Sequence, residues 1–196
     1  MKTSSQEYTD LLRQRYLPGR RIYLKYLIYP QILKRLQTGG VLDMGCGFGE
    51  FLKYLVGNGV NCLGIDSNEE HVNICRTYGL DAQVGNILSF KSEKKFKNVI
   101  LDNVMEHLDL HEISTFLENI KNNLSPSGRL IVICPCRKGQ SRDPTHKTYI
   151  TKNLIEDMAD LHDMTLAETV NMPTPFEFLG DYLYLQMRMF ILDIKG

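Results

Sequence analysis

Two acidic residues close short apolar segments in the first third of the chain, with a glycine loop between them. Asp43 follows Val41-Leu42 and precedes a loop in which every second residue is glycine (residues 45–49). Asp66 ends a second apolar segment, residues 62–65. Glycine lets a backbone approach a ligand without a clash from Cβ. A strand, a glycine turn and a helix predict a ligand crevice at the carboxyl edge of a parallel sheet.

The spacing of the glycines separates two classes of ligand. A dinucleotide fingerprint is GxGxxG, which places pyrophosphate on a helix N-terminus, whereas residues 45–49 follow GxGxG. A carboxylate at Asp43 is poorly matched to pyrophosphate but suits an ammonium group, such as the methionine end of S-adenosylmethionine. Asp66 is placed to accept the two ribose hydroxyls of a nucleoside. The alternative for either acid is a strand-end cap or a solvated turn.

Two later segments hold candidate general bases. Glu106-His107 follows the apolar segment 99–102, and Asp143 and His146 lie in a long polar connection, residues 135–150. Long loops at this edge of a sheet are more often functional than accidental. We predict catalytic roles for His107, Asp143 and His146. The alternatives are a structural histidine at 107 and an ordinary turn shaped by Asp143-Pro144.

The elements that position these residues alternate between strand-like and helix-like segments, which predicts a doubly wound α/β fold with helices on both faces. We expect strands near residues 40–44, 61–66, 82–87, 97–103, 129–134, 165–171 and 186–194. We expect helices over 5–16, 20–37, 50–56, 67–79 (opened by a capping box at Ser67) and 110–124, and after Thr151, with a turn at 126–128. His71, His111 and His162 are expected on solvent faces of helices. Residues 1–38 would form a helical cap or lid and residues 39–196 the catalytic domain.

Composition describes an ordinary globular chain of 196 residues without net charge. Met1 to Asp10 has no signal-peptide character, and the apolar stretch 182–194 is too short and polar to span a bilayer. The five cysteines, an odd number, are expected as reduced core thiols in the cytoplasm. Between Leu11 and Leu42 there are cations and no acid. This segment is a solvated basic helix face or a contact for an anionic substrate.

Four blocks together resemble the class I S-adenosylmethionine-dependent methyltransferases, particularly those similar to the ubiquinone/menaquinone-biosynthesis type. The blocks are VLDMGCGFGE at 41–50, GID at 64–66, NVMEHL at 103–108 and LSPSGRL at 124–130. The resemblance implies a Rossmann-like, seven-stranded sheet that is mostly parallel with an antiparallel last strand. It also implies cofactor-binding residues, which are Asp43, Gly45, Cys46, Gly47, Asp66, Ser67, Asn86, Ile87 and Asn103. Asn86 stands where the family often has Asp, and its amide oxygen can still accept from the adenine amino group.

The same resemblance raises a metal question, because some related methyltransferases use a Glu-xx-Glu-His metal site. In this chain Asn103 replaces the first carboxylate of that motif, which weakens a site for a hard divalent cation, although His146 could add a ligand. We therefore predict no resident metal.

The predicted activity is methyl transfer from S-adenosylmethionine to an oxygen of a small-molecule acceptor. The basic segment leaves phosphorylated and glycan-type acceptors open. The neutral total charge argues against nucleic acid as the main partner. The alternatives are an RNA methyltransferase that reads a strand end through residues 11–42, and a non-catalytic module that binds the cofactor or a partner.

Overall fold

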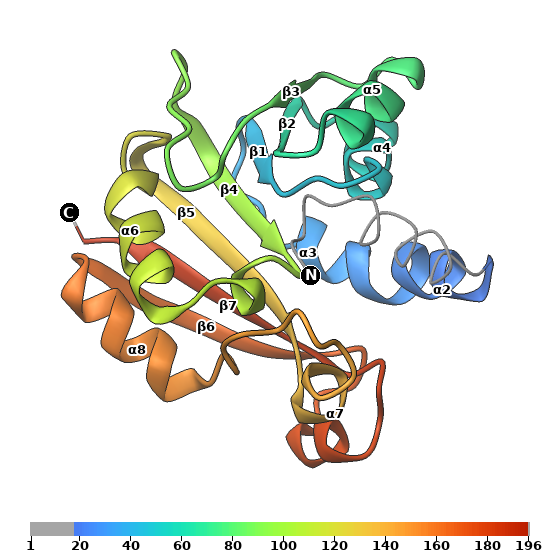
Figure 1. Cartoon of the computed structure of the whole chain (residues 1–196), viewed down its shortest axis with the longest axis vertical. Helices are drawn as coiled ribbons and strands as arrows, with labels where there is room; N and C mark the ends of the chain where they lie inside the picture. Colours follow the sequence, from blue (N-terminus) through green and yellow to red (C-terminus); the bar gives the residue numbers. More distant parts are fainter. Residues whose placement is uncertain (1–17, 196) are drawn as a thin grey trace.

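The computed structural model describes residues 18–195, so the predicted helix over residues 5–16 lies outside the described part. A single sheet has the strand order β3-β2-β1-β4-β5-β7-β6, with helices on both faces (Figure 1). Its strands are β1 (Val41–Met44), β2 (Cys62–Asp66), β3 (Ala82–Val84), β4 (Phe96–Asp102), β5 (Leu124–Pro135), β6 (Met164–Met172) and β7 (Met187–Ile194). β7 runs antiparallel to both β5 and β6, while β1 to β5 pair in parallel. The predicted seven-stranded fold is confirmed.

The helical segments are α2 (Pro18–Tyr23), η1 (Leu24–Ile28), α3 (Tyr29–Leu33), α4 (Glu50–Gly57), α5 (Glu69–Thr77), η2 (Met105–His107), α6 (Leu110–Ile120), α7 (Arg137–Gln140), α8 (Lys152–Leu161) and η3 (Glu177–Asp181). The predicted single helix over 20–37 is divided into three segments and ends earlier, at Leu33. A π-helical turn, η1, separates α2 from α3, which holds Pro30 at its start, and a proline there cannot supply a backbone donor to the preceding turn.

The caps follow local chemistry. Thr151 caps α8 through a bond from the Leu154 amide, as predicted. The cap of α5, however, is Asn68 rather than Ser67, because the Asn68 side chain accepts the Glu70 amide proton. The first residues of α5 are therefore shifted by one position from the expected start.

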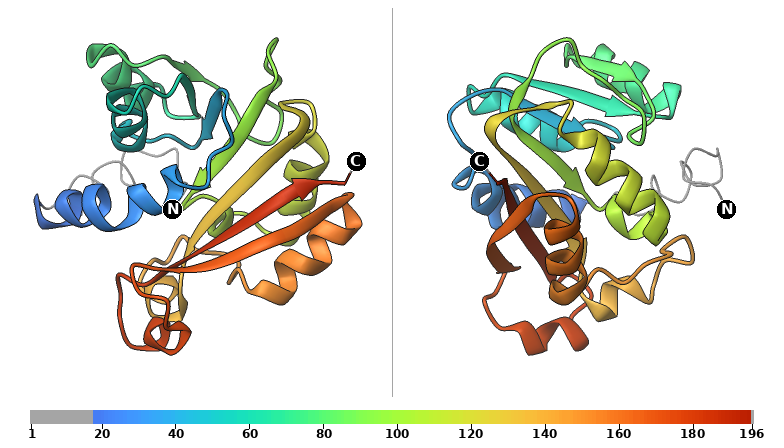
Figure 2. Two further views of the ribbon diagram at one scale, coloured as in Figure 1. Left: turned by 180° about the vertical axis from the view of Figure 1, so that it is seen from behind. Right: turned by 90° about the vertical axis from the view of Figure 1, so that its left-hand side faces the viewer.

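Side chains from the two faces of the sheet form two apolar clusters. Leu42, Met44 and Leu101 face α6 and α8, whereas Val41 and Ile100 face η1, α3, α4 and α5. This alternation follows from the two-residue period of a strand. Figure 2 shows the two helical layers from behind and edge-on. Within the predicted N-terminal cap, residues of η1 and α3 are buried in the second cluster, so they belong to the core packing.

The strand order reverses at β1, and this reversal places the crevice. From β1 the chain continues outward to β2 and β3, then returns to β4 on the other side of β1. Asp43 pairs in register with Gly64 of β2 and with Ile100 of β4. In open α/β sheets, ligands bind beyond the carboxyl ends of the strands where the order reverses.

The predicted turn at 126–128 lies inside β5 rather than before it. Leu124 already pairs with Phe96, and the register shifts before Asn98 pairs with Arg129. Ser127 takes a left-handed conformation with φ of 57°. The strand therefore begins earlier than expected and carries the turn as an irregularity.

Gly64 tests the packing beneath the glycine loop. A Cβ on this residue would lie 2.4 Å from Leu52 Cδ1 and 2.8 Å from Cys46 Sγ. We expect Gly64→Ala to lower the free energy of unfolding by about 1–3 kcal/mol, the usual cost of overpacking a core, as measured by urea denaturation.

Gly57→Ala is the matched control. It lies at the end of α4, where an added Cβ meets nothing within 4 Å. Its stability should stay unchanged or rise by about 0.4–1 kcal/mol. Equal loss in the two variants would contradict tight packing at Gly64.

Candidate active site

A cavity of about 440 Å³ lies at the carboxyl edge of the sheet. Its wall contains all the residues predicted to hold the cofactor, together with His107. These are Asp43, Gly45, Cys46, Gly47, Asp66, Ser67, Asn86, Ile87, Asn103 and His107. Segments that lie far apart in sequence are thus brought to one site. Its size is within the range of about 300–1,000 Å³ typical of ligand pockets.

Asp66 ties the glycine loop to the start of α5. Its Oδ2 accepts the Gly47 amide proton at 2.9 Å, and its Oδ1 accepts the Asn68 amide proton at 2.8 Å. Gly47 has φ of 52°, and a Cβ there would point into open space. The loop thus leaves its cavity side clear for a ligand.

His71 corrects the expectation that this histidine lies on a solvent face. Its side chain is buried, with Nδ1 3.4 Å from Asp66 Oδ1 and its ring edge-on to Phe48. Because side chains in a helix point toward its N-terminus, a residue in the first turn of α5 reaches back to the end of β2. His71 therefore contacts Asp66 within the wall of the cavity.

Two acids in the wall of the cavity have raised pKa values. Burial raises the pKa of Asp43 well above its ordinary value, and the nearby Asp102 raises it further. Burial also raises the pKa of Asp102 to about 6, while the Arg20 guanidinium and the Asn103 amide act in the opposite direction. The Asn103 side chain donates to Asp102 Oδ1 at 2.7 Å. This part of the wall favours a positively charged ligand group.

A chain of hydrogen bonds fixes the proton of His107. The Thr145 hydroxyl donates to Asp143 Oδ1 at 2.6 Å. It must then accept from His107 Nδ1, which lies 3.0 Å from it. The Thr145 carbonyl, 3.3 Å from the same nitrogen, can also only accept. Neutral His107 therefore carries its proton on Nδ1 and keeps a lone pair on Nε2.

The loop that carries Thr145 is bound firmly to the segment that carries His107. The Glu106 carbonyl accepts the amide protons of Lys147 at 2.8 Å and Thr148 at 3.1 Å. The Thr148 hydroxyl also donates to the Leu108 carbonyl at 2.7 Å. The polar connection after β5 is thus a built wall of the site.

Asp143 and His146 line a second, smaller cavity of about 110 Å³, and Asn103 and His107 line both cavities. The shared wall makes the two cavities neighbours at His107. The structure therefore brings together every residue of the predicted site, with the three candidate catalytic residues on the side away from Asp66.

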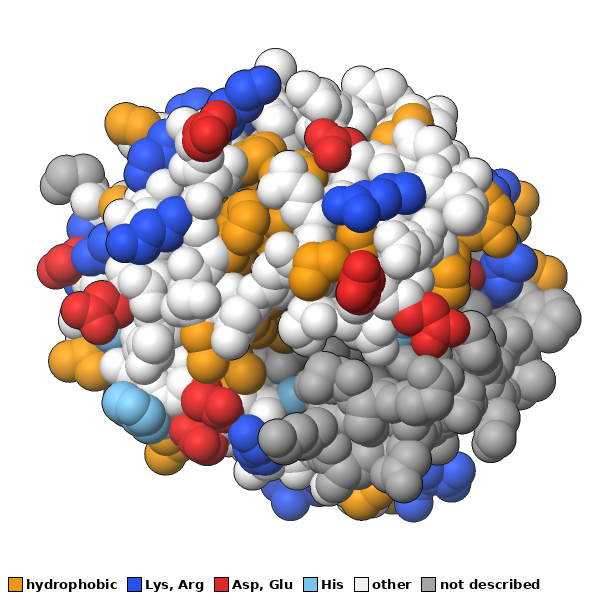
Figure 3. Space-filling view, turned by 45° about the horizontal axis from the view of Figure 1, so that its top comes forward, with side chains coloured by type: hydrophobic (Ala, Val, Ile, Leu, Met, Phe, Trp, Pro, Cys, Tyr) orange, Lys and Arg blue, Asp and Glu red, His pale blue; other side chains and the backbone are white. Residues whose placement is uncertain are grey.

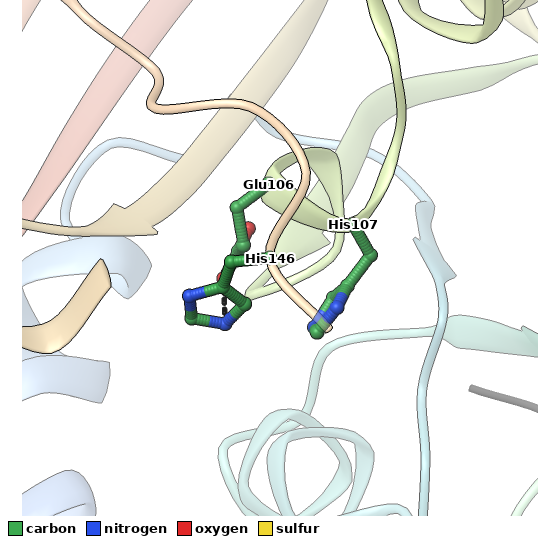
Figure 4. Close-up of side chains that lie close together, drawn as sticks. All are labelled: Glu106, His107 and His146. Carbon is green, nitrogen blue, oxygen red and sulfur yellow. Dashed lines mark ion pairs between the residues drawn. The ribbon is translucent and has the colours of Figure 1, made fainter. Parts of the chain in front are cut away.

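Glu106, His107 and His146 lie side by side (Figure 4), with possible ligand atoms all within 4.8 Å of one another. His146 Nδ1 lies 3.0 Å from the Gln140 carbonyl, which makes it a donor, and its Nε2 lies 4.0 Å from Glu106 Oε1. Among residues 18–195, neither oxygen of the buried Glu106 carboxyl has a hydrogen-bond partner. These three groups could hold a divalent cation, although Glu106 alone supplies oxygen.

Comparison with known proteins identifies the family and the fold. A family profile described as a methyltransferase domain matches residues 15–171. The chain belongs to this methyltransferase family. The expected membership in the class I S-adenosylmethionine-dependent methyltransferases is confirmed, and S-adenosylmethionine is the cofactor of this family.

The individual relatives share only low sequence identity with this chain. The chain is 28% identical over 123 residues to the ubiquinone biosynthesis O-methyltransferase of Rickettsia akari, covering 57% of this chain and 47% of that protein. The chain thus spans about half the length of this relative. The solved PH0226 protein from Pyrococcus horikoshii has a TM-score of 0.73 at 20% identity over 92% of this chain and 93% of its own. A SAM-dependent methyltransferase from Archaeoglobus fulgidus has a TM-score of 0.71 at 18% identity over 95% and 99%.

Sequence reasoning missed several residues that line the cavity or contact its wall. Arg20, Phe48 and His71 line the larger cavity, and Thr145 orients His107. For His71 a signal existed, since it lies in the first helical turn after Asp66. No local pattern indicated Thr145, whose role depends on a partner 38 residues away.

None of the helices within residues 18–195 combines the length and the hydrophobicity that a membrane span requires.

The buried Glu106 carboxyl predicts how stability varies with pH. Burial raises its pKa from 4.5 to about 8, so the folded protein keeps a proton that the unfolded chain releases. The free energy of unfolding should therefore fall as pH rises from about 4.5 to about 8, by at most about 1.4 kcal/mol per pH unit from this group. Glu106→Gln removes the titration and should make the decline shallower in denaturation series with a chelator present.

Glu118→Gln provides the control, because Glu118 is exposed on α6. Its pH profile should match that of the parent protein. A Glu106→Gln profile as steep as the parent's would contradict a protonated Glu106 in the fold.

Proposed function

We propose that this methyltransferase transfers the methyl group of S-adenosylmethionine to an oxygen of a small-molecule acceptor, with His107 as the general base. The observation that carries the proposal is the fixed proton of His107. Its Nδ1 is committed to Thr145, and the residue stands where the two cavities share a wall. The larger cavity suits the cofactor and the smaller one the acceptor.

The cofactor side fits the chemistry of a sulfonium nucleoside. Asp43, whose pKa burial raises, would hold the ammonium group of the methionine end. Asp66 would accept the ribose hydroxyls, because each of its oxygens has one backbone donor and keeps further acceptor capacity. Ser67, Asn86 and Ile87 would surround the adenine. When bound, S-adenosylmethionine supplies an electrophilic methyl group and leaves as neutral S-adenosylhomocysteine, its sulfur taking the electron pair of the broken C–S bond.

The residues of the chain then handle the acceptor and its proton. A hydroxyl of the acceptor lies in the second cavity and donates to His107 Nε2. As the oxygen forms its bond to the methyl carbon, Nε2 takes the proton and His107 becomes positively charged. Asp143 stabilises this charge through the Thr145 hydroxyl, at 2.6 Å and 3.0 Å. Much of the remaining acceleration comes from holding the reactants close and aligned.

Oxygen as the methylated atom rests on the base and on the name of the Rickettsia relative, of which this chain spans about half. The RNA alternative has less support. On the face in Figure 3, Lys and Arg lie interspersed with Asp and Glu rather than gathered in one patch, and a nucleic-acid site needs a concentrated basic surface. The cytoplasm stays the predicted location, in keeping with the buried, unpaired thiols.

Asp66 gives a direct test of cofactor binding. We expect Asp66→Ala to weaken S-adenosylmethionine by about 1.5–3 kcal/mol, the range for hydrogen bonds to a charged group, as measured by isothermal titration calorimetry. Asp81→Ala, an exposed acid before β3, is the control and should bind normally. Unchanged affinity in Asp66→Ala would refute the assignment of the ribose.

His107 tests the chemical step. With an acceptor found in a labelled-methyl screen, we expect His107→Gln to lower kcat by about 10²–10⁴, the usual contribution of a general base, with cofactor affinity retained. Thr145→Val should lower kcat less, and Thr145→Ser, which keeps the hydroxyl, should restore it. His111→Gln, exposed on α6, should be neutral.

The same assay after exhaustive chelation addresses the cluster of Glu106, His107 and His146. We predict no resident metal, so activity should survive chelation. Loss of activity that an added divalent cation restores would instead make His107 Nε2 a metal ligand and refute its role as the base.

A further inference from the structure

The second cavity has a wall whose chemistry the proposed function leaves unused. Besides His107, Asp143 and His146, it is lined by two cations, Arg20 from α2 and Arg142 from the loop after α7. They reach one small space from segments more than a hundred residues apart. Two guanidinium groups in the wall of one small cavity indicate a site for an anionic ligand group.

The acid in this wall, Asp143, contacts residues of its own loop. Asp143 Oδ1 accepts both the Thr145 amide proton at 2.9 Å and the Thr145 hydroxyl proton at 2.6 Å. Its Oδ2 lies 3.8 Å from His146 Nε2. Asp143 is buried, and these contacts fix its carboxylate within the loop of residues 143–146.

Arg142 is held at the cavity by an aromatic side chain rather than by an acid. Its guanidinium carbon lies 5.4 Å from the centre of the Tyr184 ring, and Tyr184 lines the same cavity. Among the described residues, no carboxylate lies within ion-pair distance of Arg142. Stacking leaves the planar N–H groups of arginine available for a bidentate contact with a carboxylate or phosphate.

Another part of the cavity wall holds a link between segments far apart in the sequence. The Tyr23 hydroxyl donates to the Leu185 carbonyl, and both residues line the cavity. The ring of Tyr23 and the side chain of Leu185 give this side an apolar surface. An occupant therefore meets cations, aromatic rings and His107 in one enclosure.

We propose that the acceptor is an anionic hydroxyl compound whose carboxylate or phosphate is bound by Arg142 and Arg20 while its hydroxyl faces His107. The inference rests on the proposed function, because it assigns the second cavity to the acceptor. Arg142 sets specificity at the entrance. Arg20, which also faces Asp102, lies between the anion and the cofactor cavity.

The test uses binding to the protein saturated with S-adenosylhomocysteine, so that it needs no turnover. Two matched pairs of probes are titrated by calorimetry: 3-hydroxybenzoate against 3-hydroxybenzamide, and glucose 6-phosphate against glucose. We expect the anionic member of at least one pair to bind about ten- to hundredfold more tightly than its neutral partner. The pair that shows the preference distinguishes carboxylate from phosphate.

Variants of one loop assign the preference. Arg142→Gln should abolish most of the advantage of the anion, and Arg142→Lys should keep part of it. Lys138→Gln, which removes the same charge from exposed α7 outside the cavity wall, should bind as the parent does. S-adenosylhomocysteine affinity should be equal in all three, which checks their folding.

The outcomes separate this inference from the proposed function. A protein that fails to bind S-adenosylmethionine or S-adenosylhomocysteine refutes the proposed function itself. Normal cofactor binding overturns only the anionic acceptor in three cases: no anion binds, charged and neutral probes bind equally, or Arg142→Gln keeps the preference. If Arg142→Gln lowers the affinity for charged and neutral probes equally, Arg142 has only a packing role. That result would also overturn the inference of an anionic acceptor.

Discussion

The reversal of strand order at β1 is the constraint on which the site depends. Because β2 lies on one side of β1 and β4 on the other, the loops that follow these strands diverge and leave a crevice above Asp43. The acids that end the strands are then gathered without any of them being close in sequence. Helices pack on both faces of the sheet and leave its carboxyl edge open, so the crevice is a property of the sheet.

Most of this arrangement could be predicted from sequence because its signals are local. Asp43 and Asp66 each end an apolar run, and a parallel sheet brings such ends to one edge. The position of His71 was predicted wrongly because it depends on which residue caps α5, and Asn68 and Ser67 are both good caps. Thr145 and Arg142 could not be predicted, since their roles come from contacts between a loop and segments far along the chain.

The two cavities of the proposed site differ in the charged groups that line them. On the cofactor side, burial works against the charged forms of Asp43 and Asp102, which a cationic ligand would offset. On the other side, Asp143 accepts from the Thr145 hydroxyl, and Arg20 and Arg142 line the cavity. His107 stands at the boundary, with its proton directed away from both cavities. Under the proposed function, the positive charge that develops on His107 is stabilised by Asp143 through Thr145.

The link from Tyr23 to Leu185 has a consequence for how the molecule is made. Most of the cofactor wall comes from one continuous stretch, roughly residues 43–112, whereas the smaller cavity needs α2 and the segment just before β7 at once. The ribosome must therefore synthesise the chain as far as β7 before the second compartment can form. The stretch proposed to bind the nucleoside is complete about 70 residues earlier.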